Sequence, residues 1–378
     1  MRCAKALLGT ALALAVSGAT LSAAEAEAGP RAPRTERVST AGDGAQLDGR
    51  SLDAGISADG RYVAFATKAE RLRCHQQTYT CLVLKDRVTG ALTPIPNGGD
   101  SSWGTPLLSR DGRRVGHTAG TKSPAPMVYD RETGRNVNVG APGHGTGLLR
   151  AVSADGDTVA YTSGDRFRPA QNLRVRDLVT GADELVGGDS WFGPASLSAD
   201  GGLLAYTTRG ADGVDLFVRD RGTGATTQLD RGLGDAGFVQ LAGNGRTALF
   251  AAGGRTYAYD LRKGAAREVA GRPAEAASPD ARHAVLAEGA DGTALTVLDV
   301  RTGRRTPGGP GAVTPGSVTA GGRAVAFSTL PVSGSHSRTS VSVSTNSRAR
   351  TSSLRLVSWV DDVSSPYGQR RARSAFSR

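Results

Sequence analysis

A stretch of twelve residues, ISADGRYVAFAT at Ile56–Thr67, recurs along the chain with its Asp-Gly turn in the same place. It returns as VSADGDTVAYTS at Val152–Ser163 and as LSADGGLLAYTT at Leu197–Thr208. The matching turn positions are Asp59, Asp111, Asp155, Asp200, Asn244, Asp280 and Gly321. Their spacing of 36 to 52 residues suits four short strands with their turns and is typical of propeller blades. The repeat therefore predicts an all-β protein, a seven-bladed β-propeller with four-stranded antiparallel blades.

The run that follows each turn is apolar at successive positions. Val63, Ala64 and Phe65 illustrate it in the first copy. A strand needs apolar residues on both sides when both faces of its sheet are covered, as in blades stacked face to face. His117 occupies the position equivalent to Phe65 in the second copy of the repeat, and we interpret it as a core residue.

A second motif, D-x-x-T-G, follows each copy and weakens only to DLRKG at Asp260–Gly264. Its Gly supplies the left-handed residue of a short hairpin, and its Asp can accept backbone N–H bonds. The recurring Asp residues of both motifs are therefore predicted to be structural turn residues and not catalytic ones. They are Asp59, Asp86, Asp111, Asp130, Asp155, Asp177, Asp200, Asp220 and Asp299.

Each unit is predicted to run strand a, Asp-Gly turn, strand b, loop, strand c, D-x-x-T-G turn, strand d. The seventh unit has its strand b at Arg323–Thr329, and Ser340–Ser344 and Leu354–Trp359 are candidates for further strands. Thr35–Thr40 resembles a strand d that precedes the first unit. A ring needs its ends paired, so we expect this N-terminal strand to complete the last blade.

The linked motifs resemble the Asp-rich, WD-like repeats of the TolB-type propeller family. The resemblance covers about Thr35 to Leu330 and implies the propeller fold more specifically than any activity. TolB carries an α/β domain ahead of its propeller. We expect no such domain here, because few residues precede Thr35.

The N-terminus has the pattern of a secretory signal peptide. Arg2 and Lys5 precede an apolar run, and A-x-A sites end at Ala26 and Ala28. The alternative, a membrane anchor, would need a longer run. We expect a signal peptide at 1–28 cleaved near Ala26 or Ala28, a secreted propeller at 29–360 without a membrane span, and a basic tail without fixed structure at 361–378.

Two cysteines remain after such cleavage. Cys74 and Cys81 are predicted to form a disulfide, because paired cysteines outside the cytoplasm are usually oxidised. A zinc site would need a second pair of ligands, so we predict no metal ligands. The sequence leaves open a cation held by backbone carbonyls in the central channel.

Strand direction assigns the loops to faces. In a meander the a–b and c–d turns share one face, called the turn face, whereas the b–c and d–a loops share the other, called the variable face. Irregular loops are the better candidates for binding. The candidate ligand-binding residues on the variable face are Trp103, His144, Arg166, Arg168, Asn172 and Trp191. Aromatic, Arg and Asn side chains could hold a sugar or a peptide. The alternative is that each Trp packs over its own blade.

No sequence motif indicates catalysis. The chain has no G-x-S-x-G elbow and no P-loop, and its five histidines form no short ligand pattern. We therefore expect a monomeric, non-enzymatic binding or scaffold module without a cofactor, with a protein or cell-wall glycan as partner. The alternative is a carbohydrate-active lyase or hydrolase with a pocket at the channel mouth. The net charge is +11, and about half of the excess lies between Arg338 and Arg378. This Arg-rich tail adds an anionic polymer as a candidate partner.

Overall fold

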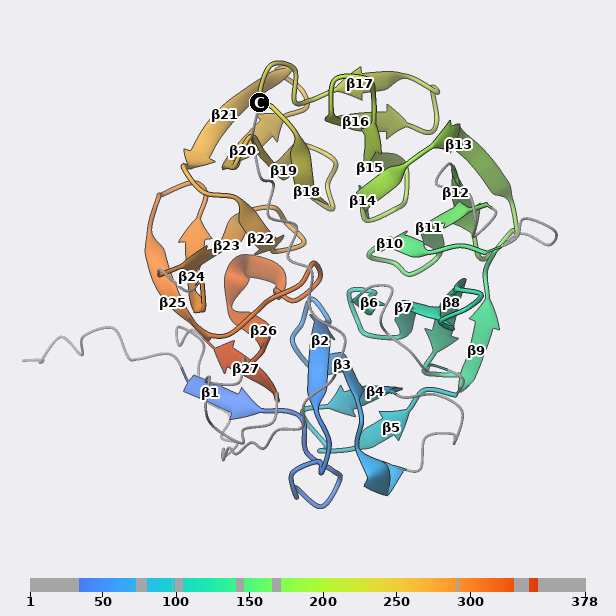
Figure 1. The fold of residues 1–378 in the computed structure, drawn as a ribbon, viewed down its shortest axis with the longest axis vertical. Coiled ribbons are helices and arrows are strands. Elements are labelled where there is room, and N and C mark those ends of the chain that lie inside the picture. Colours follow the sequence, from blue (N-terminus) through green and yellow to red (C-terminus); the bar gives the residue numbers. More distant parts are fainter. Residues whose placement is uncertain are drawn as a thin grey trace, which may run out of the picture. The chain divides into compact units, whose positions relative to one another are not determined.

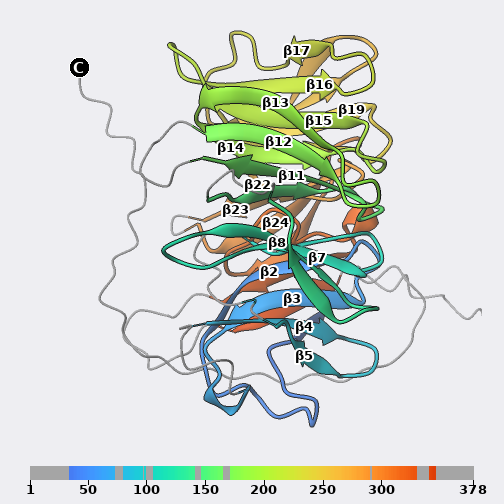
Figure 2. The same cartoon turned by 90° about the vertical axis from the view of Figure 1, so that its right-hand side faces the viewer.

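The computed structural model describes residues 34–72, 80–96, 98, 105–140, 146–164, 171–289, 292–329 and 340–345, all within one compact unit, Ala32–Arg378. There, seven antiparallel sheets form a ring, which confirms the predicted seven-bladed propeller (Figure 1). The strands run roughly along the axis of the ring (Figure 2). Turns and loops therefore collect at its two ends, as the meander predicts.

Each of the first six blades has four strands, ordered along the chain from the centre of the ring to its rim. Blade one comprises β2 (Ser51–Ile56), β3 (Tyr62–Thr67), β4 (Cys81–Asp86) and β5 (Leu92–Pro94). Blade two comprises β6 (Leu107–Leu108), β7 (Arg114–Ala119), β8 (Ala125–Asp130) and β9 (Arg135–Asn138). Blade three comprises β10 (Leu149–Val152), β11 (Thr158–Ser163), β12 (Gln171–Asp177) and β13 (Asp183–Ser190).

The next three blades repeat this order. Blade four comprises β14 (Phe192–Leu197), β15 (Leu203–Arg209), β16 (Val214–Asp220) and β17 (Thr226–Gln228). Blade five comprises β18 (Ala236–Leu241), β19 (Thr247–Ala252), β20 (Arg255–Asp260) and β21 (Ala265–Ala270). Blade six comprises β22 (Ala274–Ala277), β23 (His283–Glu288), β24 (Ala294–Asp299) and β25 (Arg305–Pro310). Two short 3₁₀ turns, Glu70–Leu72 and Ala320–Gly322, complete the described elements.

Blade seven is built from both ends of the propeller. β26 (Ala324–Ser328) pairs with β27 (Val341–Thr345), and β27 pairs with β1 (Arg34–Arg37). The predicted closure by the N-terminal strand is confirmed, although β1 is shorter than predicted. Blade seven is also less regular than the predicted four strands, because its innermost strand is reduced to a bridge between Val318 and Val325.

The Asp-Gly turns have a shared hydrogen-bonding pattern. In blade one the Ser57 hydroxyl donates to the Asp59 carboxylate, which also accepts the N–H of Arg61 at 3.0 Å. Ser57 Oγ in turn accepts the N–H of Tyr62 at 2.9 Å. Gly60 has φ +81°, a conformation that favours Gly. The same Ser–Asp contact recurs in blades two, three, four and six, so the motif encodes a self-contained turn.

These turns are also joined to one another around the channel. In most blades, the residue that follows the Ser position of the turn donates its N–H to the carbonyl of the equivalent residue in the next blade. Blade three differs, because the N–H comes from Asp155, one residue later. The bonds run Ala58 to Arg110, Arg110 to Ala154, Asp155 to Ala199, Ala199 to Gly243, Gly243 to Pro279, and Ala320 to Ala58. The junction between blades six and seven lacks the corresponding bond, because Pro279 has no N–H. We call this ring of bonds the turn belt.

The core lies between neighbouring blades. Phe65 is fully buried in a cluster that includes Val63 of blade one and Val341 and Val343 of blade seven. His117 is 3% exposed, as its place in the apolar column predicts, and its Nε2 lies 3.1 Å from Asn136 Oδ1. Burial lowers the pKa of His117 to about 4, so the ring is neutral at pH 7.

Several predictions concern residues outside the described part of the chain. These are the signal peptide, the basic tail, the strand at Leu354–Trp359 and Cys74, and all stay predictions. Cys81 is buried at the start of β4. Among the described residues, no helix is long and apolar enough to cross a lipid bilayer.

Candidate functional site

The variable face has one exposed aromatic side chain within the part of the chain that the structure describes. Trp191 lies in the d–a connection between β13 and β14 and is 40% exposed. The Arg209 guanidinium, at the end of β15, lies 5.5 Å from the centre of its ring. A d–a residue and a b–c residue thus meet on one face, as the meander predicts.

Local contacts fix the position of Trp191. Its carbonyl accepts hydrogen bonds from Thr208 Oγ1 at 2.9 Å and from the N–H of Arg209 at 3.1 Å. Its ring lies so close to Gly193 that a Cβ at that position would come within 2.5 Å of the indole. The indole is therefore held against the end of blade four with part of its surface open to solvent.

The other candidate residues on the variable face divide into two groups. Asn172 is half-buried in β12, and its side-chain oxygen lies beside Gly188 of β13. It is thus one blade away from the side chain of Arg209. Trp103, His144, Arg166 and Arg168 fall outside the described residues, so their grouping with Trp191 stays a prediction.

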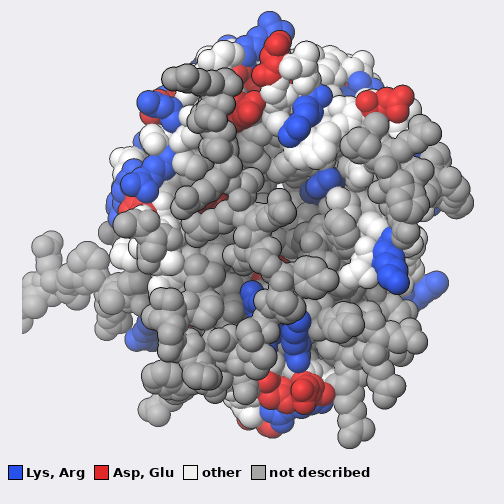
Figure 3. Space-filling model, in the orientation of Figure 1, with Lys and Arg blue, Asp and Glu red and all other residues white. Residues whose placement is uncertain are grey.

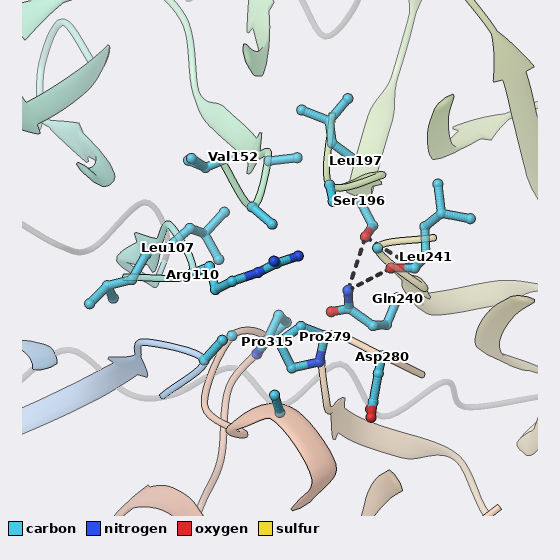
Figure 4. A pocket seen from close by; sticks show the side chains of 18 of the residues that line it. Leu107, Arg110, Val152, Ser196, Leu197, Gln240, Leu241, Pro279, Asp280 and Pro315 are labelled. Atoms are coloured by element: carbon cyan, nitrogen blue, oxygen red, sulfur yellow. Dashed lines mark hydrogen bonds between the residues drawn. The ribbon is translucent and has the colours of Figure 1, made fainter. Parts of the chain in front are cut away.

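A second candidate site is the central cavity, with a volume of about 880 Å³. Its wall comes from the innermost strands and from the turns of the turn belt. The apolar part of the lining includes Leu107, Val152, Leu197, Leu241, Pro279 and Pro315 (Figure 4). None of the predicted ligand-binding residues that the structure describes, Asn172 and Trp191, lines this cavity.

Polar groups interrupt the apolar lining at a few places. The Arg110 side chain extends from its turn into the open centre of the cavity (Figure 4). Across from it, Gln240 Nε2 donates to Ser196 Oγ at 3.3 Å and to the Leu241 carbonyl at 3.0 Å. Gln240 and Ser196 therefore bind each other, whereas Arg110 points into space that a ligand could occupy.

Arginine dominates the charged lining. Arg110, Arg150, Arg282 and Arg323 line the cavity, against the carboxylates of Asp59 and Asp280. Both carboxylates already accept hydrogen bonds within their own turns. Among the described residues, none of the four guanidinium groups takes part in an ion pair. The cavity is therefore electropositive.

Arg150 is the most deeply placed of these cations. Its Nη2 donates to the Phe192 carbonyl at 2.8 Å, but its Nε is buried without a hydrogen-bond partner. Burial lowers the pKa of Arg150 to about 10. The group stays charged at pH 7, and an anion in the cavity would offset part of its desolvation.

The two arginines inside the channel were missed in the sequence, although each departs from a pattern. Arg110 follows the Ser of its turn, where the other blades have Ala58, Ala154, Ala199, Gly243, Pro279 and Ala320. Arg150 stands three residues before the Ser of its turn, where blades four and five have Ala195 and Val239 and blade six has Glu275. A large cation where most blades have a small or apolar residue was the available signal.

No metal site is apparent among the described residues, where no three His, Cys, Asp or Glu side chains gather closely enough to hold an ion. On the rim of the ring, Lys and Arg side chains alternate with Asp and Glu (Figure 3). The rim visible in that view therefore has no surface of a single charge.

Asp53, on the innermost strand of blade one, has a carboxyl group with a raised pKa. It adopts φ +57° in the irregular part of the β2–β3 pairing. Burial raises the pKa of its carboxyl to about 6, although Arg50 opposes the shift. The folded state therefore binds a proton that the unfolded state releases between about pH 4 and pH 6, so the stability of the fold decreases as the pH rises through this window.

We expect Asp53→Asn to remove that decrease, because the amide does not ionise and Asn tolerates positive φ. At pH 7 the variant should be more stable than the parent by up to about 3 kcal/mol, the equivalent of two pKa units. Urea unfolding at pH 4 and pH 7 measures the difference. The exposed Asp212→Asn is the matched control, and an unchanged pH slope in Asp53→Asn would contradict the assignment.

Comparison with known proteins gives the fold and no family. No protein-family model matches the chain. No curated protein matches it either. Among solved structures, it is similar to an oligogalacturonate lyase in complex with manganese, with 14% identity, a TM-score of 0.63, and coverage of 85% of this chain and 95% of that one.

Two further structures are similar. An oligogalacturonate lyase from Vibrio parahaemolyticus has 13% identity and a TM-score of 0.59, over 83% of this chain and 97% of that one. TolB from Acinetobacter baumannii has 16% identity and a TM-score of 0.46, over 71% and 67%. The solved structures similar to this chain thus include oligogalacturonate lyases and TolB. At such identities they share a fold with this chain, and the repeat family predicted from its motifs stays a prediction.

Proposed function

We propose that this chain is a secreted, non-enzymatic binding module that recognises a protein or cell-envelope ligand on its variable face. The observation that carries the proposal is the exposed Trp191 ring, which the Arg209 guanidinium contacts. The carbonyl of Trp191 accepts hydrogen bonds from Thr208 Oγ1 and from the N–H of Arg209. A rigid aromatic surface beside a cation suits the apolar face of a sugar or a peptide side chain. Trp103, His144, Arg166, Arg168 and Asn172 would extend this surface.

The proposal predicts that Trp191→Ala will lower the affinity for the ligand at least about tenfold, because a central aromatic contact commonly contributes 2 kcal/mol or more. The measurement is binding of the purified protein to peptidoglycan, to a glycan panel and to envelope proteins. Arg209→Met should weaken binding less, because it removes only the cationic partner.

The control is Val179→Ala, which changes a side chain exposed to 72% in a c–d turn, at the opposite end of the ring. If Trp191→Ala binds as tightly as Val179→Ala, the Trp191 surface is not the site. Steeply salt-dependent binding that is lost when residues 361–378 are removed would instead assign recognition to the basic tail.

The second candidate is a carbohydrate-active lyase or hydrolase. The observation in its favour is the electropositive central cavity of about 880 Å³, which is large enough for a small saccharide. The same binding assay, with release of sugar products measured in parallel, distinguishes the two functions. New reducing ends or unsaturated sugars that disappear in Arg110→Met, but persist in Trp191→Ala, would support the enzyme and overturn the binding module.

A further inference from the structure

We propose that the central cavity is a binding site for an organic anion, a carboxylate with an apolar body, whose charged group is held by Arg110 and Arg150. This inference goes beyond the recognition proposed for the variable face. It concerns a different set of residues, enclosed by the inner strands and the turn belt.

The charged residues of the cavity wall indicate the charge of the ligand. The four arginines outnumber the two carboxylates, and those carboxylates are already engaged by Ser hydroxyls and backbone N–H groups of their turns. A cation in the cavity would face uncompensated guanidinium groups, whereas an anion would be attracted to them. The lining therefore selects an anion over a cation.

Two observations place the charged group near blades two and three. Arg110 extends into the open centre of the cavity (Figure 4). Arg150 has a buried Nε without a hydrogen-bond partner. The turn of Arg110 is also bonded directly to the turn that follows the strand of Arg150, through the N–H of Arg110 and the Ala154 carbonyl at 2.8 Å. The two cations thus come from neighbouring blades that are bonded to each other. The Arg150 Nε itself is closed off from the cavity, so Arg150 attracts a carboxylate through a positive charge that no ion pair among the described residues compensates.

The rest of the wall favours an apolar body. Leu107, Val152, Pro279 and Pro315 come from four different blades, are not fully buried, and border the space beside Arg110. The nearby amide of Gln240 is already bonded to Ser196 and to the Leu241 carbonyl. A ligand rich in hydroxyl groups would leave many of them without partners against this wall, at a cost in desolvation. A hydrocarbon chain or an aromatic ring would not.

The test uses 4-phenylbutyrate and octanoate as probes, each paired with its neutral amide, in calorimetric titrations of the whole protein. We expect saturable binding of the acids, with affinities at least about tenfold above those of the amides, because the difference isolates the charged group. Arg110→Met and Arg150→Met should each reduce binding of the acids at least about tenfold and leave the amides nearly unchanged.

Matched variants separate this effect from misfolding and from the variable face. Arg262→Met removes an exposed guanidinium from the c–d turn of blade five and should change nothing. Arg150→Lys keeps the charge and should recover part of the affinity lost in Arg150→Met. Trp191→Ala should leave probe binding intact even if it abolishes recognition on the variable face.

Three results would overturn the proposal. Equal affinities of acid and amide would mean that the cavity is only an apolar space. Absence of saturable binding up to about 10 mM, well beyond the range expected for a compact site, would mean that the cavity holds only water. A loss of binding in Arg262→Met as large as in Arg110→Met would equally remove the case for the two cavity arginines.

Discussion

A chain that begins at Ala41 will lose most of its stability, although it lacks only seven of the residues that the structure describes. β1 completes blade seven by pairing with β27 in the register Arg34 with Thr345 through Arg37 with Ser342. Without it, β27 becomes an open edge strand, which favours aggregation. Removal of the buried Val38 and of the paired backbone should lower the free energy of unfolding by at least about 5 kcal/mol.

Two further contacts are lost with the strand. Glu36 forms a 2.6 Å ion pair with Arg87 of blade one. The ammonium of Lys85, a residue only 5% exposed, donates to the Thr40 carbonyl at 2.9 Å. Its removal leaves a buried cation with fewer acceptors, which is costly. These contacts tie the closing strand to the first blade, so the loss is not confined to blade seven.

The measurement is urea unfolding followed by tryptophan fluorescence and circular dichroism. A chain that begins at Arg34 is the matched control and should unfold like the full-length protein. A synthetic peptide of Arg34–Thr40 should restore part of the stability when added at millimolar concentration. Unfolding midpoints that coincide for the chains beginning at Arg34 and Ala41 would contradict the role of β1 as the closing strand.

The second large effect is expected for Phe65→Ala. Phe65 is fully buried, in a cluster that contains residues of both blade one and blade seven. Truncation leaves a cavity between two rigid sheets, and the cost of such a change is about 3–5 kcal/mol. The denaturant midpoint should fall accordingly, with an unchanged or slightly smaller slope.

Phe65→Leu provides the matched comparison, because blade six already has Leu286 in the equivalent column. It should cost about 1 kcal/mol, since most of the volume is retained. If Phe65→Ala were no more destabilising than Phe65→Leu, the interface between blades one and seven would not be a packed core. The N-terminal strand would then close the ring through its hydrogen bonds alone.

The propeller could be predicted because its information is local and repeated. Ser57, Asp59 and Gly60 form a complete hydrogen-bonded turn within a few residues, so each copy predicts the same hairpin independently. The closing strand was predictable for a similar reason, because Thr35–Thr40 has the pattern of a strand d without its own blade. Its short paired length depends on the neighbouring strand and could not be predicted from its own residues.

The candidate site could be predicted less well, because it depends on distances between blades. Trp191 was found as an aromatic residue in an irregular loop, but its contact with Arg209 follows from the pairing of β14 with β15. Arg110 and Arg150 lie 40 residues apart in the sequence, and only the ring brings them to one cavity. Sequence periodicity predicts which side of a strand is apolar, whereas it does not show that the inner strands leave a space.

The missing bond at Pro279 has a mechanical consequence. Each other junction of the turn belt resists separation of its two blades at the turn face, whereas blades six and seven are held there without that bond. A packed cluster that contains Val285 of blade six and Phe327 of blade seven holds this junction instead. Under outward strain we expect it to separate at the turn face more readily than the other six junctions, which have the bond. At the rim, β1 pairs with β27 within blade seven and contacts blade one through the ion pair between Glu36 and Arg87. Any widening of the channel should therefore begin at the junction of blades six and seven, while the pairing of β1 with β27 keeps the ring closed.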